Sequence, residues 1–143
     1  FFKKASASLK GRVYVRIGFD EALAHLIYAG SDFFLMPSQY EPCGLGQLIA
    51  MRYGTVPIAR KTGGLADTIQ DYDHMKHTGT GFLFNDYTPY ALQNAVKRAI
   101  CVFSDKTNMK NMAREVMKNN FSWSRSTDKY IELYMLARKK VSK

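Results

Sequence analysis

Four consecutive apolar residues, Phe33 to Met36, place the tightest limit on the fold of this chain. The run is too short for a typical helix, it shows no alternation with polar residues, and Pro37 ends it. Unbroken apolar runs of this length are typical of parallel strands that are buried on both faces of a sheet. A turn rich in Pro and Gly follows, and then an apolar segment of helical length. We therefore predict a strand at 32–36 in a parallel sheet covered by helices.

The same order of strand and helix recurs along the chain. The other expected strands are 12–17, 56–59 and 81–84, and the expected helices are 20–28, 45–53, 65–69, 88–103, 109–117 and 130–141, with a polar loop at 70–81. Asp20 and Thr88 suit helix N-caps, and Gly54 suits the position after a helix end. This order predicts an α/β fold with a Rossmann-like parallel sheet and flanking helices. Since a full sheet of this type has about six strands, we expect 1–143 to be part of a domain from a longer protein.

Composition excludes several classes of protein. With 143 residues, 46% hydrophobic and 23% charged, the chain has the size and composition of one globular domain. No apolar run approaches the roughly 20 residues of a membrane span. Two cysteines cannot form a disulfide scaffold, so free thiols in a reducing compartment are expected.

The charge balance indicates an anionic partner. Lys and Arg number 21 and Asp and Glu 12, which gives a net charge of +9. The basic residues are spread along the chain, and no zinc-finger spacing or RNA-binding motif accompanies them. A solvated basic surface is therefore favoured over nucleic-acid binding.

The turn after the strand at 32–36 carries the clearest candidate site. Ligands of parallel α/β sheets bind beyond the carboxyl ends of the strands. Gly44 and Gly46 allow the backbone to approach a ligand closely, and free N–H groups at a helix start favour phosphate. Glu41 suits a sugar hydroxyl, which donates hydrogen bonds to a carboxylate. From the residues alone, a Pro/Gly turn with a surface Glu explains this stretch equally well.

Two further turns follow predicted strands. Gly63 and Gly64 follow the strand at 56–59 and either present backbone N–H groups to a ligand or form a tight turn. Phe19 follows the strand at 12–17 and either stacks on a nucleobase or packs in the core. Taken alone, the tight turn and the core position are favoured.

Other reactive residues point less clearly to a site. Asp71, Asp73, His74 and His77 are close enough in sequence to bind a metal, but scattered surface residues of a polar loop are the favoured interpretation. Cys43 has no His fixed near it in sequence, so packing of a small residue is favoured over a nucleophile.

Three stretches carry a resemblance to a known family. They are Glu-Pro-Cys-Gly-Leu at 41–45, Ala-Met-Arg-Tyr-Gly-Thr-Val-Pro at 50–57 and Thr-Gly-Gly-Leu-Ala-Asp-Thr at 62–68. With 25–32 and Phe-Ser-Trp-Ser at 121–124, they resemble the bacterial glycogen synthases and plant starch synthases of glycosyltransferase family 5. The resemblance covers nearly the whole chain.

The resemblance implies a GT-B enzyme, with the active site in the cleft between two Rossmann-like domains. Such enzymes move glucose from ADP-glucose to the non-reducing end of an α-1,4-glucan, with retention at the anomeric carbon, and need no metal. They work in the bacterial cytoplasm or the plastid stroma. The chain resembles most of the second, nucleotide-sugar-binding domain. The glucan acceptor is expected on the first domain, and the last helix is expected to cross towards it with its apolar stripe exposed here.

The resemblance also implies roles for individual residues. Glu41 matches the motif carboxylate that is expected to contact the donor glucose, and Phe19 matches an aromatic position that packs on adenine. The remaining donor-binding residues are expected to be Cys43, Gly44, Leu45, Gly46, Gly63 and Gly64.

Departures from the family pattern limit these expectations. Position 46 is Gly where bacterial relatives often have Thr, and Ile49 stands where the wider retaining GT-B group has a second Glu. The family's Lys-x-Gly-Gly-Leu loop and its pyrophosphate-clamping Arg and Lys are absent, so the chain alone is expected to be inactive. Two alternatives stay open: a GT-B transferase for another nucleotide sugar, and a non-catalytic basic module that binds glucan or nucleic acid.

Overall fold

A three-stranded parallel sheet with helices around it forms the centre of the molecule. The computed structural model describes residues 1–141, except that the Val141 side chain, in the predicted stripe of the last helix, lies outside the described residues. The elements are α1 (Phe2–Ser8), α2 (Glu21–Gly30), β1 (Phe33–Met36), α3 (Gly46–Arg52), β2 (Val56–Arg60), α4 (Gly63–Thr68), β3 (Phe82–Phe84), α5 (Pro89–Ser104), α6 (Lys106–Met117) and α7 (Trp123–Val141). The strands lie in the order β1-β2-β3 and are all parallel. The predicted α/β class and parallel sheet are confirmed.

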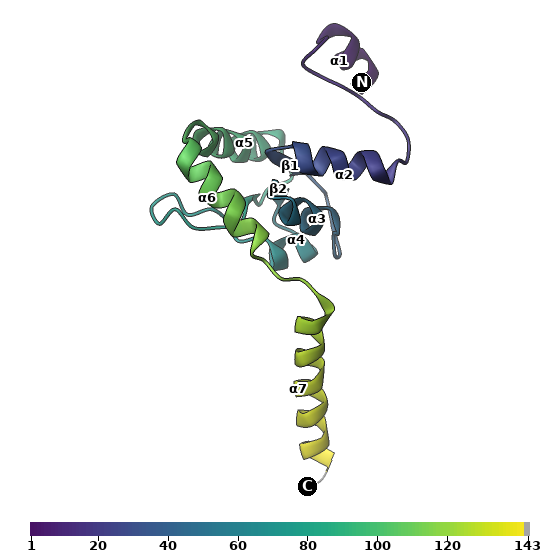
Figure 1. Ribbon diagram of the computed structural model, residues 1–143, viewed down its shortest axis with the longest axis vertical. Coiled ribbons are helices and arrows are strands. Elements are labelled where there is room, and N and C mark those ends of the chain that lie inside the picture. Colours follow the sequence, from purple (N-terminus) through teal and green to yellow (C-terminus); the bar gives the residue numbers. More distant parts are fainter. Residues whose placement is uncertain (142–143) are drawn as a thin grey trace.

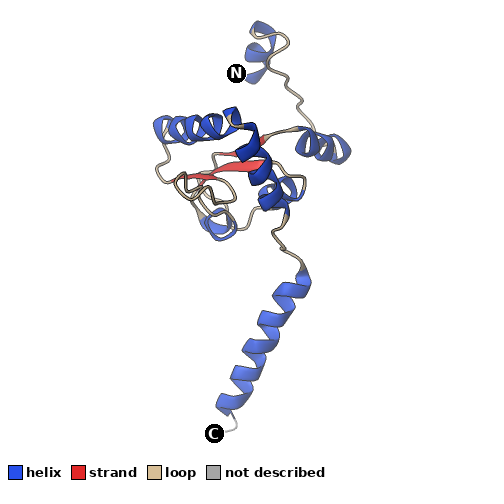
Figure 2. Cartoon of the chain, turned by 60° about the vertical axis from the view of Figure 1, so that its left-hand side comes forward, coloured by secondary structure: helices blue, strands red, loops and turns tan. Residues whose placement is uncertain are grey.

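The core forms on both faces of β2, the central described strand. Alternate side chains of a strand point to opposite faces, so Val56 and Ile58 pack with the buried residues of α5 and α6, while Ala59 joins a smaller cluster with Leu65 of α4. Figure 2 shows α6 crossing in front of the strands, with α5 above them. This packing fixes the carboxyl ends of the strands relative to the helices that begin there.

The predicted helix ends are confirmed at the positions with capping chemistry. The Asp20 carboxylate accepts a hydrogen bond from the Leu23 amide at 3.0 Å, and the Thr88 hydroxyl accepts one from the Ala91 amide at 3.2 Å. Gly54 follows α3 with a φ of +85°, a conformation that glycine adopts without strain.

The strand predicted at 12–17 is wrong. This segment runs unpaired between α1 and α2 (Figure 1), with Tyr14 85% and Ile17 69% exposed. A strand is stabilised by hydrogen bonds to a neighbour, and no described strand lies beside this segment. The prediction that β1 is buried on both faces is also wrong: none of its four residues is fully buried, and Leu35 is 46% exposed. β1 lies at the edge of the described sheet, where β2 is its only described neighbour.

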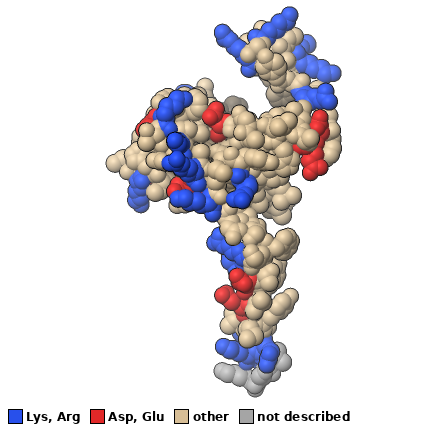
Figure 3. Space-filling view, in the orientation of Figure 1, with Lys and Arg blue, Asp and Glu red and all other residues tan. Residues whose placement is uncertain are grey.

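Helix α7 projects away from the sheet (Figure 1), and Figure 3 shows Lys and Arg side chains near both ends of this helix. Its apolar stripe is exposed, as predicted: Tyr130 is 55%, Ile131 53% and Tyr134 71% accessible. None of the described helices combines the length and the apolar character that a membrane crossing requires.

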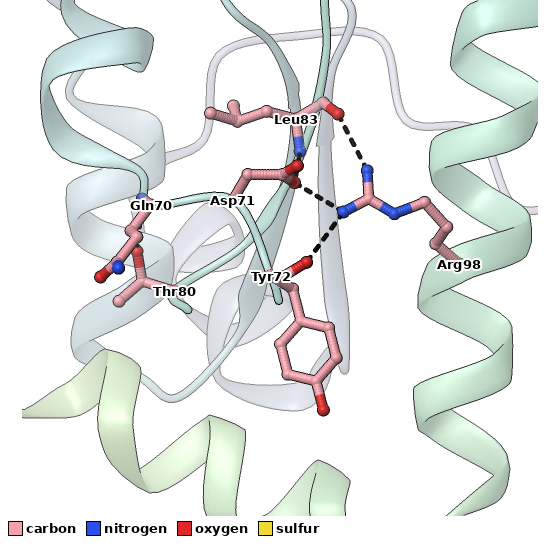
Figure 4. Close-up of polar contacts among 6 residues, drawn as sticks. All are labelled: Gln70, Asp71, Tyr72, Thr80, Leu83 and Arg98. Carbon is pink, nitrogen blue, oxygen red and sulfur yellow. Dashed lines mark hydrogen bonds and ion pairs between the residues drawn. The ribbon is translucent and has the colours of Figure 1, made fainter. Parts of the chain in front are cut away.

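The polar loop at 70–81 is fastened to α5 (Figure 4). One oxygen of Asp71 accepts hydrogen bonds from the Leu83 amide at 2.7 Å and from Arg98 at 2.8 Å. The Arg98 guanidinium also donates to the carbonyl oxygens of Leu83 and Tyr72, at 3.2 and 3.1 Å. The loop therefore has a defined shape despite its polar sequence.

Candidate functional site

The turn between β1 and α3 places Glu41 beyond the carboxyl end of β1, as predicted. Glu41 is half-buried, and the Ser38 hydroxyl lies 3.4 Å from one of its carboxylate oxygens as a donor. Cys43 is exposed, and Leu45 is 71% exposed, so the backbone of the turn is open to solvent on this side.

The backbone of Gly63 and Gly64 packs directly against the backbone of this turn. The Gly64 amide donates hydrogen bonds to the carbonyl oxygens of Glu41 and Pro42, at 3.0 and 3.2 Å. A Cβ atom at Gly64 would lie 2.1 Å from the Cys43 carbonyl oxygen, and one at Gly63 would lie equally close to that of Glu41. The two loops therefore approach to a distance that only glycine allows. The Gly64 N–H is used inside the protein, so the structure gives this glycine pair a bracing role.

Gln47 positions the turn through contacts that the sequence analysis missed. Its side chain is completely buried. Its amide nitrogen lies 2.8 Å from the Gly44 carbonyl oxygen, 3.2 Å from the Cys43 carbonyl oxygen and 3.2 Å from the Thr68 hydroxyl oxygen. Gln47 thus ties the turn to α4. The spacing of apolar residues could have revealed this position: Ala50 and Met51, three and four residues after Gln47, are buried on the same face of the helix.

The start of α3 offers unpaired backbone donors. No side chain caps this helix, and the residue before its N-cap, Gly44, has a φ of +70° that directs the chain into it. Gly46 fits closely: a Cβ atom there would lie 3.0 Å from the Phe34 ring and 3.3 Å from the Tyr28 hydroxyl. Glycine at 46 therefore matches an interior already filled by Phe34 and Tyr28.

Arg60 brings a cation to the same edge of the sheet, and each of its three nitrogens already donates to a backbone carbonyl oxygen. Its guanidinium donates to the carbonyl oxygens of Ser38, at 2.9 Å, of Gln39, and of Asn85, at 3.2 Å, and it lies over the Tyr87 ring. Arg60 thereby joins the loops that follow β1 and β3. The sequence analysis did not single it out, because nothing in sequence reveals which carbonyl groups surround it.

Phe19 lies apart from these residues. It is 96% exposed on the segment between α1 and α2. The structure therefore brings the two glycine-containing turns together but leaves Phe19 in solvent, and its role at the nucleobase stays a prediction.

The loop residues considered for a metal have other partners. Asp71 pairs with Arg98, and the His77 ring lies 3.1 Å from the Tyr72 hydroxyl and 3.0 Å from the Asn108 amide. Among the described residues, no group of three or more His, Cys, Asp or Glu is arranged to hold a metal ion.

Comparison with known proteins identifies the family. The family model described as "Glycosyl transferases group 1" matches residues 3–119, most of the chain. The chain belongs to the glycosyl transferases group 1 family. Among curated members similar to it, the glycogen synthase of Thermodesulfovibrio yellowstonii is 58% identical over 127 residues, and that of Desulforudis audaxviator is 47% identical over 142. These alignments cover 89% and 99% of this chain but 24% and 28% of the relatives.

Solved structures of glycosyl transferases extend the comparison. The catalytic domain of starch synthase IV from Arabidopsis thaliana, bound to ADP and acarbose, matches with a TM-score of 0.82 and 40% identity, over 99% of this chain and 29% of that one. A sucrose-phosphate synthase from Thermosynechococcus elongatus matches with a TM-score of 0.66 and 26% identity, over 96% and 34%. The predicted fold and the predicted resemblance to glycogen and starch synthases are confirmed. The chain spans about a quarter of the length of the curated relatives it matches.

Proposed function

We propose that this chain is the donor-binding part of a retaining glucosyltransferase, which moves glucose from ADP-glucose to the non-reducing end of an α-1,4-glucan. One observation carries the proposal: the turn that holds Glu41 is braced by Gly63, Gly64 and Gln47 directly before the uncapped start of α3. The similarity to glycogen synthases along the same residues supports it. Chain 1–143 then forms part of the nucleotide-sugar-binding domain, in the cytoplasm of a bacterium.

The proposed chemistry uses few groups of this chain. The free amides at the start of α3 stabilise the negative charge that develops on the leaving ADP, since backbone donors fixed in advance need no reorganisation. Glu41 accepts hydrogen bonds from hydroxyls of the donor glucose and orients it. Arg60 already binds backbone carbonyl groups, so the leaving ADP needs further cations. We propose that these cations and the acceptor site lie in the part of the whole protein that corresponds to the rest of the relatives. The chain alone then does not transfer glucose.

Amide NMR titrations with ADP, UDP and ADP-glucose test this proposal. We expect ADP to shift the amides of 44–48 more than UDP does. Glu41→Gln keeps the size of the side chain and removes its charge, so it should leave ADP binding unchanged and weaken ADP-glucose. A well-dispersed spectrum in which neither nucleotide shifts 44–48 would refute the donor site.

Phe19 is proposed to stack on adenine. Base–aromatic stacking is worth about 1–3 kcal/mol, so Phe19→Ala should weaken ADP binding by roughly fivefold or more. Tyr14→Ala is the matched control, because Tyr14 is an exposed aromatic of the same segment. Equal ADP affinity in both variants would remove Phe19 from the site and leave the turn unaffected.

The likeness to a sucrose-phosphate synthase supports a second candidate, a transferase of the same fold that uses another nucleotide sugar. Larger shifts with UDP than with ADP at 44–48 would favour that candidate.

A further inference from the structure

A hollow lies beside α3, away from the turn that holds Glu41. It has a volume of about 820 Å³ and is bounded by α2, by α3 and by the segment 117–122 that leaves α6. No residue of Glu41–Gly46 or Gly63–Gly64 lines it. In Figure 1 this segment passes below α3 and α4 before α7 begins.

Aromatic rings line the hollow and one of them is held in place. Tyr53 is 44% exposed, and its hydroxyl lies 3.1 Å from the His25 Nδ1, with the two rings edge to face at 5.8 Å. Phe121, 39% exposed, lies on the segment that leaves α6. A ring fixed in advance loses little conformational entropy when a ligand packs on it.

Unpaired polar groups lie between the rings. The Arg52 guanidinium forms no ion pair within the described chain. The Asn119 side chain donates from its amide nitrogen to the Val116 carbonyl oxygen, and the Asn120 side-chain oxygen accepts from the Ser122 amide. Within the described residues, the Asn119 side-chain oxygen and the Asn120 side-chain nitrogen have no hydrogen-bond partner. The hollow therefore offers both donors and an acceptor, which suits hydroxyl groups because a hydroxyl does both.

A second cavity of about 460 Å³ adjoins the hollow at residues 119–122. The two share Leu48 and residues 119–122, and the second adds Thr68, Ser126, the acidic Asp67 and the cations Arg125 and Lys129. We call the pair the α3 trough, defined by these lining residues together with His25, Arg52 and Tyr53. A trough that runs through two cavities suits an extended chain molecule better than a compact one.

We propose that the α3 trough binds a stretch of α-1,4-glucan and so anchors the polymer on this domain, apart from the donor turn. The identity of the polymer rests on the proposed function. Glucose units present an apolar C–H face to rings such as Tyr53 and hydroxyl edges to amides and guanidinium groups. A polyanion fits less well, because most of the surface that lines the larger cavity is apolar, its Lys118 already pairs with Glu115 at 2.5 Å, and the Asp67 carboxylate lines the smaller cavity.

NMR titration of the chain with maltoheptaose tests this, with ADP titrated separately. We expect saturable shifts at residues of the trough, namely 25, 49–53, 67–68 and 117–129, and no change in the response of 44–47 to ADP. Tyr53→Ala and Phe121→Ala should each weaken maltoheptaose about tenfold. Tyr53→Phe, which keeps the ring and loses the bond to His25, should weaken it no more than about twofold. Tyr90→Ala is the control, since this 72% exposed Tyr lies on α5 outside the trough.

Each outcome decides the proposal. If maltoheptaose shifts only 44–47, or shifts neither 49–53 nor 117–122 in a folded chain that binds ADP, the trough is refuted and the donor site is unaffected. Shifts in the trough without any ADP binding would support the trough and refute the donor site. If heparin shifts the trough residues with a steep salt dependence while maltoheptaose does not, the trough binds polyanions and our proposal is wrong. Because Phe121 lies on a connecting segment, its variant decides the matter even if Tyr53→Ala unfolds.

Discussion

Replacing Gly64 with Ala should disrupt the candidate site through a single methyl group. The added Cβ atom would lie 2.1 Å from the Cys43 carbonyl oxygen and 2.7 Å from its carbonyl carbon, whereas real Cβ contacts almost never fall below 3.0 Å. The oxygen must therefore retreat by about 0.9 Å, the difference between 3.0 and 2.1 Å. Since the obstacle is backbone, no side-chain rotation relieves it.

The expected magnitude follows from two opposing effects. Ala favours the helical backbone of α4 by up to about 1 kcal/mol over Gly. Against this stand overpacking of about 1–3 kcal/mol and the weakening of two hydrogen bonds from the Gly64 amide, each worth about 0.5–1.5 kcal/mol. We expect a net loss of about 2–4 kcal/mol in the free energy of unfolding, and, from a shift near 1 Å in the turn, a large loss of ADP affinity.

Urea unfolding followed by circular dichroism measures the stability, and the ADP titration measures the site. Gly30→Ala is the matched control, because Gly30 also lies in a helix and a Cβ atom there meets nothing within 4 Å. It should change the free energy of unfolding by less than about 1 kcal/mol. If Gly64→Ala unfolds at the same urea concentration as Gly30→Ala and binds ADP like the unaltered chain, the bracing role of the glycine pair is refuted.

Two further substitutions test other contacts. Arg98→Met should lower the free energy of unfolding by about 1–2 kcal/mol, because the Leu83 and Tyr72 carbonyls and the half-exposed Asp71 lose a shared donor; amide exchange should speed up across 70–81, and unchanged exchange there would contradict this. Gly46→Thr should cost about 1–3 kcal/mol, because its Cβ meets the Phe34 ring at 3.0 Å; a thermal melt that matches the unaltered chain would show that the interior adapts freely.

Local sequence signals determined much of the fold. The apolar run at 33–36, the caps at Asp20 and Thr88, and Gly54 after α3 predicted where elements begin and end, because these signals act within a few residues along the chain. The segment 12–17 shows the limit of such signals. Its alternating pattern is that of a strand, but a strand needs a neighbour, and pairing is not a local property.

The candidate site divides in the same way. The sequence by itself determined that a glycine-rich turn with Glu41 follows an apolar strand, and that a second glycine pair follows the next strand. Only the tertiary structure decided that these turns touch, that Gln47 ties them to α4, and that Arg60 spends its donors on neighbouring loops. The physical reason is distance along the chain: Glu41 and Gly64 are brought together by the parallel pairing of β1 with β2, and contacts between residues so far apart leave no periodic pattern in the sequence.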